Sequence, residues 1–152
     1  MSETESIFCP IRKAWVAALP EELVRQRFIT YMTEERGFPA SLISVEKSLR
    51  QLPHLALTDS QHIPDRRADI LCFAKGVNGV YPLLLVECKA VKLIPTVVSQ
   101  IVGYNHHVGA SFIAVVNQTE MRVGWFDKSK REYVFLNTLP TYVDLLNARQ
   151  ET

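Results

Sequence analysis

The stretch that decides the fold is YPLLLVECKA, residues 81–90. Its apolar run, Leu83–Val86, is typical of a strand that is buried on both faces of a sheet. The run leads directly into Glu87 and then, two residues later, into Lys89. Because side chains alternate along a strand, these two charged groups point to one face and Cys88 points to the other. The stretch therefore predicts a central strand whose end carries a carboxylate and an ammonium to the same place.

The composition is that of one globular domain with a core. Of the 152 residues, 47% are hydrophobic and 22% are charged, which excludes disordered and membrane classes. No apolar run approaches the roughly 20 residues of a membrane-spanning helix, and the N-terminus lacks the apolar core of a secretory signal. The net charge of +1 means that any contact with nucleic acid depends on a local basic patch. Three cysteines without metal-ligand spacing favour a reducing cytoplasm.

The first 19 residues differ in pattern from the rest. Residues 1–19 are expected to be a poorly patterned lead-in, from which Trp15, Val16 and Leu19 dock onto a single domain of residues 20–152. That domain carries no G-x-x-x-x-G-K-[ST] sequence, so the chain has no P-loop motor of its own.

The order of elements predicts an α/β fold. We expect a helix over 20–37, strands over 41–52, 66–74 and 83–90, a helix over 95–109, a strand over 111–117, a hairpin over 121–136 and a last short helix over 139–152. The turn that contains Gly76, Asn78 and Gly79 pairs the second and third strands antiparallel. An apolar strand followed by a helix and another apolar strand predicts a parallel crossover. The sheet is therefore expected to be central, mixed in direction and flanked by helices.

Asp69 joins Glu87 and Lys89 in a candidate site. It lies in the second predicted strand, and the hairpin can bring it close to Glu87 at the end of the third. Two carboxylates at a strand end suit Mg²⁺ or Mn²⁺, which polarise a phosphodiester and activate a bound water. Lys89 can then hold the water or stabilise charge on the phosphorus oxygens. The alternative is an ion pair in which Lys89 neutralises Glu87 or Asp69, and charge chemistry alone favours that reading.

A family resemblance shifts this balance. Asp69 followed by Glu87-Cys88-Lys89 at the end of an apolar strand resembles the motif of the PD-(D/E)xK nuclease superfamily, whose core has the same helix–three strands–helix–strand order. The segments RRADILCF and PLLLVECKA look like parts of the N-terminal nuclease domain of type I restriction enzyme R subunits.

A second motif supports the resemblance. Gln100 and Tyr104 match the Q-x-x-x-Y motif on the helix after the catalytic strand in those subunits and in RecB-like nucleases. Positions four apart share one face of a helix, so both side chains can point toward the strand ends. The resemblance covers most of the chain, roughly from RKAWVAALPEELVRQRF (residues 12–28) to the YVFL strand (residues 133–136).

The resemblance implies a role for each matching residue in a Mg²⁺-dependent (or Mn²⁺-dependent) endonuclease that cuts DNA. Asp69, Glu87 and the backbone carbonyl of Cys88 would hold the metal, while Lys89 would position or activate the water. Gln100 and Tyr104 would steady the site and the DNA backbone. Glu22 matches a position where the superfamily often has an acid near the metal. The basic residues near the site that are expected to hold DNA phosphates are Arg66, Arg67 and Lys92.

Other readings stay open. Asp65, after Pro64, is the alternative to Asp69 as the aspartate of the motif. An acid in the first helical turn is also explained by capping electrostatics, so Glu22 has a second explanation. Glu46 could join the metal cluster, although a solvated strand face is the plainer interpretation.

The absent motor leaves the working form of the protein open. The domain is expected to act alone, to form a homo-oligomer or to work with separately encoded restriction-system subunits. A catalytically silent DNA-binding or assembly module of the same fold is the alternative function.

Overall fold

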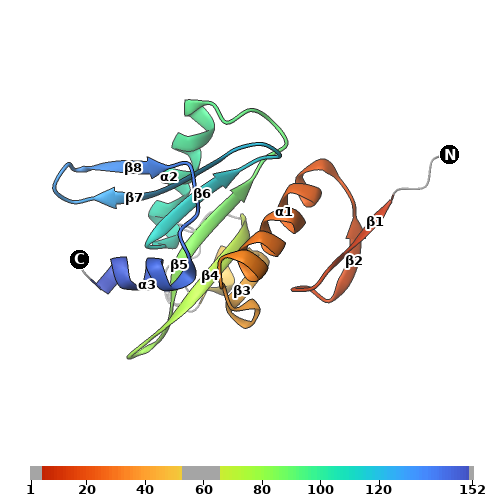
Figure 1. Cartoon of the computed structure of the whole chain (residues 1–152), viewed down its shortest axis with the longest axis horizontal. Helices are drawn as coiled ribbons and strands as arrows, with labels where there is room; N and C mark the ends of the chain where they lie inside the picture. The colour runs from red at the N-terminus through yellow and green to blue at the C-terminus, as the bar shows by residue number, and fades with distance from the viewer. Residues whose placement is uncertain (1–4, 53–65, 151–152) are drawn as a thin grey trace.

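A six-stranded mixed sheet forms the centre of the computed structural model, which describes residues 5–52 and 66–150 (Figure 1). The strands follow one another across the sheet in chain order. They are β3 (Ile43–Ser48), β4 (Arg67–Gly76), β5 (Gly79–Cys88), β6 (Phe112–Val116), β7 (Met121–Asp127) and β8 (Glu132–Leu136). Neighbouring strands are antiparallel except β5 and β6, which are parallel. The predicted α/β fold class is confirmed.

The predicted central strand is β5, and its pairing on both sides is as the sequence indicates. The turn between β4 and β5 begins after Gly76 and ends at Gly79, which has a left-handed φ of 116° that favours glycine. The antiparallel register pairs Ile70 with Val86 near the far end of this hairpin. On its other side β5 pairs with β6, whose five residues are all buried. The apolar run of β5 thus lies between two paired strands.

Two helices cover opposite faces of the sheet and produce two separate cores. The helix α1 (Pro20–Thr30), which continues into a π-helical turn (Tyr31–Glu35), packs with Val86 and Cys88 of β5 on one face. The helix α2 (Pro95–Val108) packs with Leu85 on the other face. A third helix, α3 (Tyr142–Gln150), joins the first core through Leu145. No helix among the described residues is long and apolar enough to cross a membrane.

The lead-in differs from the expectation. It forms a small hairpin of β1 (Ser6–Cys9) and β2 (Ala14–Ala17) beside α1 (Figure 1). The expected docking of Trp15 and Leu19 is wrong, because these side chains are 72% and 58% exposed. Trp15 instead packs on Phe8 within the hairpin, where the ring centroids lie 5.5 Å apart. Cys9 at the end of β1 is fully buried, and Ile11 in the turn after it packs against the first core.

The hairpin of β7 and β8 offers a test of the packing. A Cβ added at Gly124 would lie 2.6 Å from two ring atoms of Phe135 and 2.8 Å from the carbonyl oxygen of Val134. We expect Gly124→Ala to lower the free energy of unfolding by about 1–3 kcal/mol, since the backbone of β8 would have to move. Thermal denaturation followed by circular dichroism measures the change.

The matched control is Gly103→Ala in α2. A Cβ at Gly103 meets no atom within 4 Å, and alanine favours a helix over glycine by about 1 kcal/mol. This variant is expected to be as stable as the wild type or more stable. Equal unfolding midpoints for the two alanine variants would contradict the tight β7–β8 approach.

Candidate active site

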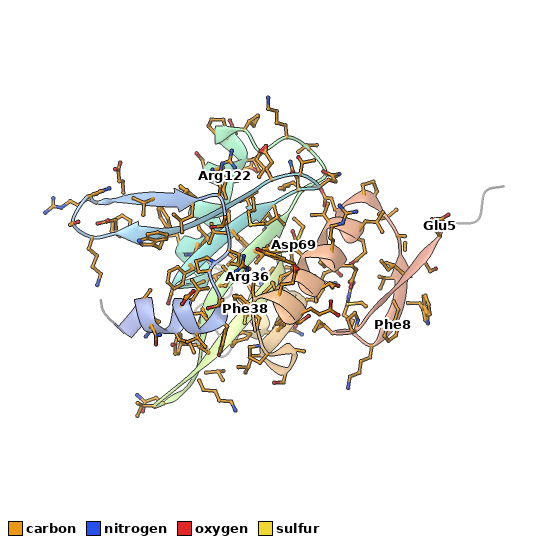
Figure 2. All side chains as sticks on the ribbon, in the orientation of Figure 1. Glu5, Phe8, Arg36, Phe38, Asp69 and Arg122 are labelled. Atoms are coloured by element: carbon orange, nitrogen blue, oxygen red, sulfur yellow. The ribbon has the colours of Figure 1, made fainter. Side chains whose placement is uncertain are left out.

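The ends of β4 and β5 bring Asp69, Glu87 and Lys89 together. The register that pairs Ile70 with Val86 places Asp69 beside Glu87 when it is continued by one residue. The backbone amide of Cys88 donates a hydrogen bond of 2.8 Å to Oδ2 of Asp69, which ties the two strand ends together. Figure 2 labels Asp69 where α1 lies over the strands. The structure thus places these three side chains at the same strand ends.

Glu87 is a buried carboxylate with one oxygen left over. Its side chain is only 10% exposed. Oε1 accepts a hydrogen bond of 2.9 Å from Arg66 and lies 3.5 Å from Nζ of Lys89. Oε2 is buried, and no donor among the described residues reaches it. Burial, and then the negative charge of Asp69, raise the pKa of Glu87 above its ordinary value, although Arg66 and Lys89 oppose the shift.

Asp69 is held from α1 by an arginine that the sequence did not single out. Oδ1 of Asp69 lies 3.1 Å from Nη2 of Arg25, which is 5% exposed. The same guanidinium contacts Glu22 at 2.9 Å and Glu46 at 3.5 Å. Arg25 and Gln26 follow Glu22 at three and four residues, so all three share a face of α1. That spacing, in a helix already expected to pack on the sheet, was the available signal.

Arg12 of the lead-in completes this ion-pair network. Its guanidinium lies 2.7 Å from Glu22 and 3.4 Å from Glu46. Nothing in the local sequence pointed to Arg12, because its position depends on the β1–β2 hairpin turning it toward α1. We call Arg12, Glu22, Arg25, Glu46 and Asp69 the arginine–carboxylate network.

The two acids considered as extra metal ligands, Glu22 and Glu46, both belong to this network. Glu22 has both oxygens engaged, one with Arg25 and the other with Arg12 and Gln26. Burial favours a higher pKa for Glu22, but the hydrogen bonds from Arg12 and Gln26 outweigh it and hold the pKa below the usual value. Glu46 adopts a left-handed φ of 54° within β3, a strained conformation for this residue. Its side chain is 41% exposed.

On the opposite face, α2 contributes Tyr104. This residue is buried, and the guanidinium carbon of Arg66 lies 4.1 Å from the centre of its ring. Its hydroxyl is buried without a partner among the described residues. Burial is the main cause that raises the pKa of Tyr104 well above its ordinary value, so the phenol stays neutral.

The remaining predicted residues make no hydrogen bond or ion pair with Asp69 or Glu87 in the described parts of the chain. Gln100 is exposed one turn before Tyr104, and in the described parts of the chain no hydrogen bond joins it to the strand ends. Arg67 and Lys92 are also exposed. Asp65, the alternative to Asp69, lies outside the described residues.

The residues present fit a hard divalent cation. Within residues 5–52 and 66–150, no group of three His, Cys, Asp or Glu side chains could hold a metal. Asp69 and Glu87 supply two carboxylates, and Mg²⁺ is commonly held by one or two carboxylates plus waters and substrate phosphates. Oε2 of Glu87 is buried and has no donor among the described residues, so it is available to a cation.

Comparison with known proteins identifies the family and the fold of the chain. Residues 20–140 match the family described as type I restriction enzyme R protein N terminus (HSDR_N). No curated protein matches the sequence. Among solved structures, the chain is similar to a fragment described as an HsdR subunit of a type I restriction enzyme from Vibrio vulnificus YJ016, with a TM-score of 0.54 and 20% identity.

That likeness concerns the fold and a limited part of the relative. It covers 84% of this chain and 25% of the Vibrio fragment, so the chain spans about a quarter of the length of that structure. The family match runs from the first residue of α1 to just beyond β8. The chain belongs to the family of type I restriction enzyme R protein N-terminal domains.

Proposed function

We propose that this domain is a metal-dependent nuclease that hydrolyses phosphodiester bonds in DNA. One observation carries the proposal. Glu87 is buried at a strand end beside Asp69, its pKa is raised, and one of its oxygens has no donor among the described residues. A purely structural ion pair would gain nothing from an unsatisfied buried oxygen, which costs about 1–3 kcal/mol. The family membership supports a role in DNA restriction.

Asp69, Glu87 and the backbone carbonyl of Cys88 are the residues that would hold Mg²⁺ or Mn²⁺. When bound, such an ion supplies Lewis-acid polarisation of the phosphodiester and a lower pKa for bound water. The protein fixes Asp69 from two sides, through the Cys88 amide and through Arg25. Glu22 acts on the site indirectly, through Arg25. It accepts a hydrogen bond from the Arg25 guanidinium and so orients the group that holds Asp69.

Lys89 supplies a positive charge on the Glu87 side. Its ammonium lies 3.5 Å from Oε1 of Glu87, and its backbone amide donates to the carbonyl of Val116 at 2.9 Å. The backbone bond anchors Lys89 to β6, so its side chain starts from a fixed point. In the proposed reaction Lys89 positions the attacking water and stabilises the negative charge that grows on the phosphorus oxygens.

The DNA backbone would run past the strand ends. Arg66, Arg67 and Lys92 are partly or fully exposed around this edge and would hold phosphates, while Tyr104 and Gln100 line the α2 side. The three described cysteines are free and buried, which together with a DNA substrate supports a cytoplasmic protein. In this proposal the domain works as a homo-oligomer or with separately encoded restriction-system subunits.

Cleavage assays test the catalytic residues directly. With Mg²⁺ or Mn²⁺, the wild type is expected to nick or linearise plasmid DNA or to shorten linear DNA. Glu87→Gln and Lys89→Met should each lower the rate about 100-fold or more, the usual worth of a group acting on the reacting water. The matched controls are Glu132→Gln on β8 and Lys75→Met at the far end of β4, both exposed, which should cut at the wild-type rate.

Two outcomes would contradict the proposal, the first by rejecting the assigned site and the second by rejecting the nuclease activity. Equal cleavage by the wild type and both site variants would show that the chemistry lies elsewhere. DNA binding that depends on salt but is indifferent to Mg²⁺, with no cleavage at all, would identify a catalytically silent binding module instead.

The metal-free protein should also reveal the cost of the buried charge. Because the pKa of Glu87 is raised, the folded state binds this proton more tightly than the unfolded state. The resulting stabilisation is complete below the unfolded pKa and is lost as pH rises through the higher folded pKa. Glutamine cannot ionise, so the Tm of Glu87→Gln minus that of the wild type should increase with pH across this window.

Thermal denaturation in chelator over a series of pH values measures this difference. Glu132→Gln, an exposed variant of the same chemistry, should show a Tm difference that stays flat over the same range. A flat or falling difference for Glu87→Gln would mean that the carboxylate is not destabilised by its surroundings.

A further inference from the structure

Arg66 contacts both the end of β5, through Glu87, and the helix α2, through Tyr104. Its Nη2 donates to Oε1 of Glu87 at 2.9 Å, and its guanidinium carbon lies 4.1 Å from the centre of the Tyr104 ring. The two partners are buried, whereas the Arg66 side chain is 39% exposed. The arginine therefore covers the carboxylate from the solvent side.

The three cations around the carboxylates differ in how firmly they are held. Arg25 is buried and contacts three carboxylates, which hold its guanidinium in one position. Lys89 lies farther from Glu87, at 3.5 Å, and its backbone is bonded to β6. Arg66 makes the shorter contact but also reaches solvent. Of the three, Arg66 is the one that can leave without breaking a buried network.

A divalent cation and Arg66 would compete for the same carboxylate, that of Glu87. Two like charges a few ångströms apart repel strongly at a partly buried site. Glu87 has only one oxygen beyond the one that Arg66 occupies, and a cation that binds between Asp69 and Glu87 meets the guanidinium at close range. The stacking on Tyr104 does not depend on Glu87, so it can keep the displaced guanidinium close to the site.

We propose that Arg66 is an exchangeable counter-ion, which neutralises Glu87 when the site lacks a divalent cation and turns to a DNA phosphate when a cation binds. The inference rests on the proposed nuclease function and adds a regulatory consequence to it. Arg66 would then couple the two ligands, so that each raises the affinity for the other by the same factor. The protein would hold cations weakly until DNA is present.

Binding of Mn²⁺ in the absence of DNA tests the competition. We expect Arg66→Met to bind Mn²⁺ about tenfold more tightly than the wild type, because a repelling unit charge is removed. Arg66→Lys keeps the charge and should bind close to the wild-type value. Calorimetry or Mn²⁺ electron paramagnetic resonance measures the constants at about pH 8, which limits competition from protons. Arg66→Gln replaces the methionine variant if circular dichroism shows that the latter is unfolded.

Arg149 provides the matched control. Its guanidinium carbon lies 3.9 Å from the centre of the Tyr81 ring, so it also stacks on a tyrosine. Tyr81 precedes Glu87 by six residues in β5, a distance of about 20 Å along an extended strand. Arg149→Met removes a stacked arginine of the same kind, and it should leave the Mn²⁺ affinity unchanged.

The coupling has its own measurement. Fluorescence anisotropy of a labelled DNA duplex, with and without Ca²⁺, gives the factor by which a hard cation raises DNA affinity in the wild type. We expect Ca²⁺ to raise the DNA affinity of the wild type by a factor several-fold larger than it does in Arg66→Met. The variant lacks the arginine both with and without Ca²⁺, so it cannot show this coupling. Ionic strength is matched in the two series, because phosphate contacts depend on salt.

The results separate this inference from the nuclease function. Tighter Mn²⁺ binding by Arg66→Met in a protein that never cuts DNA would support the counter-ion and reject the nuclease. Equal or weaker Mn²⁺ binding by Arg66→Met in a protein that does cut DNA would overturn the counter-ion alone. If neither the wild type nor Arg66→Met binds Mn²⁺, both the counter-ion role of Arg66 and the metal-dependent nuclease are rejected.

Discussion

The hydrogen bond from the Cys88 amide to the Asp69 carboxylate is the constraint on which the site depends. It joins the beginning of β4 to the end of β5 at the point where the ladder of backbone pairs stops at Ile70 and Val86. Without that bond the two strand ends could splay apart, and the carboxylates of Asp69 and Glu87 would be separated. Both strands are buried and covered by a helix on each face, so the packing of the two cores fixes the positions of the strand ends.

Much of this arrangement could be predicted because it follows from short-range rules. The apolar run before Glu87 requires a doubly covered strand, the glycine turn fixes the antiparallel partner, and the helix that ends at Gly109 returns the chain for a parallel pair. Asp69 and Glu87 meet as a consequence of these three facts. A family resemblance then gave meaning to a pair of carboxylates that charge alone left ambiguous.

The rest depended on contacts between segments that are distant in sequence. Arg12 reaches Glu22 only because a four-residue strand pairs with another and turns the loop toward α1, and no periodicity announces such a short hairpin. Arg25 is buried in contact with three carboxylates, one each from α1, β3 and β4, and only the packing of α1 on the sheet brings these together. Gln100 shares a helix face with Tyr104 in principle, but it lies one turn closer to the exposed N-terminal end of α2.

The β1–β2 hairpin extends the electrostatic environment of the site beyond the segment that matches the family. The family match begins at Pro20, after both strands, whereas the arginine–carboxylate network extends back to Arg12. Removing the first 19 residues would take one positive charge from a network of two arginines and three carboxylates and leave Glu22 with less compensation. A fragment cut at the family boundary would therefore carry a different electrostatic potential at Asp69. Similarity in sequence and the extent of the electrostatic unit thus mark different borders in the same chain.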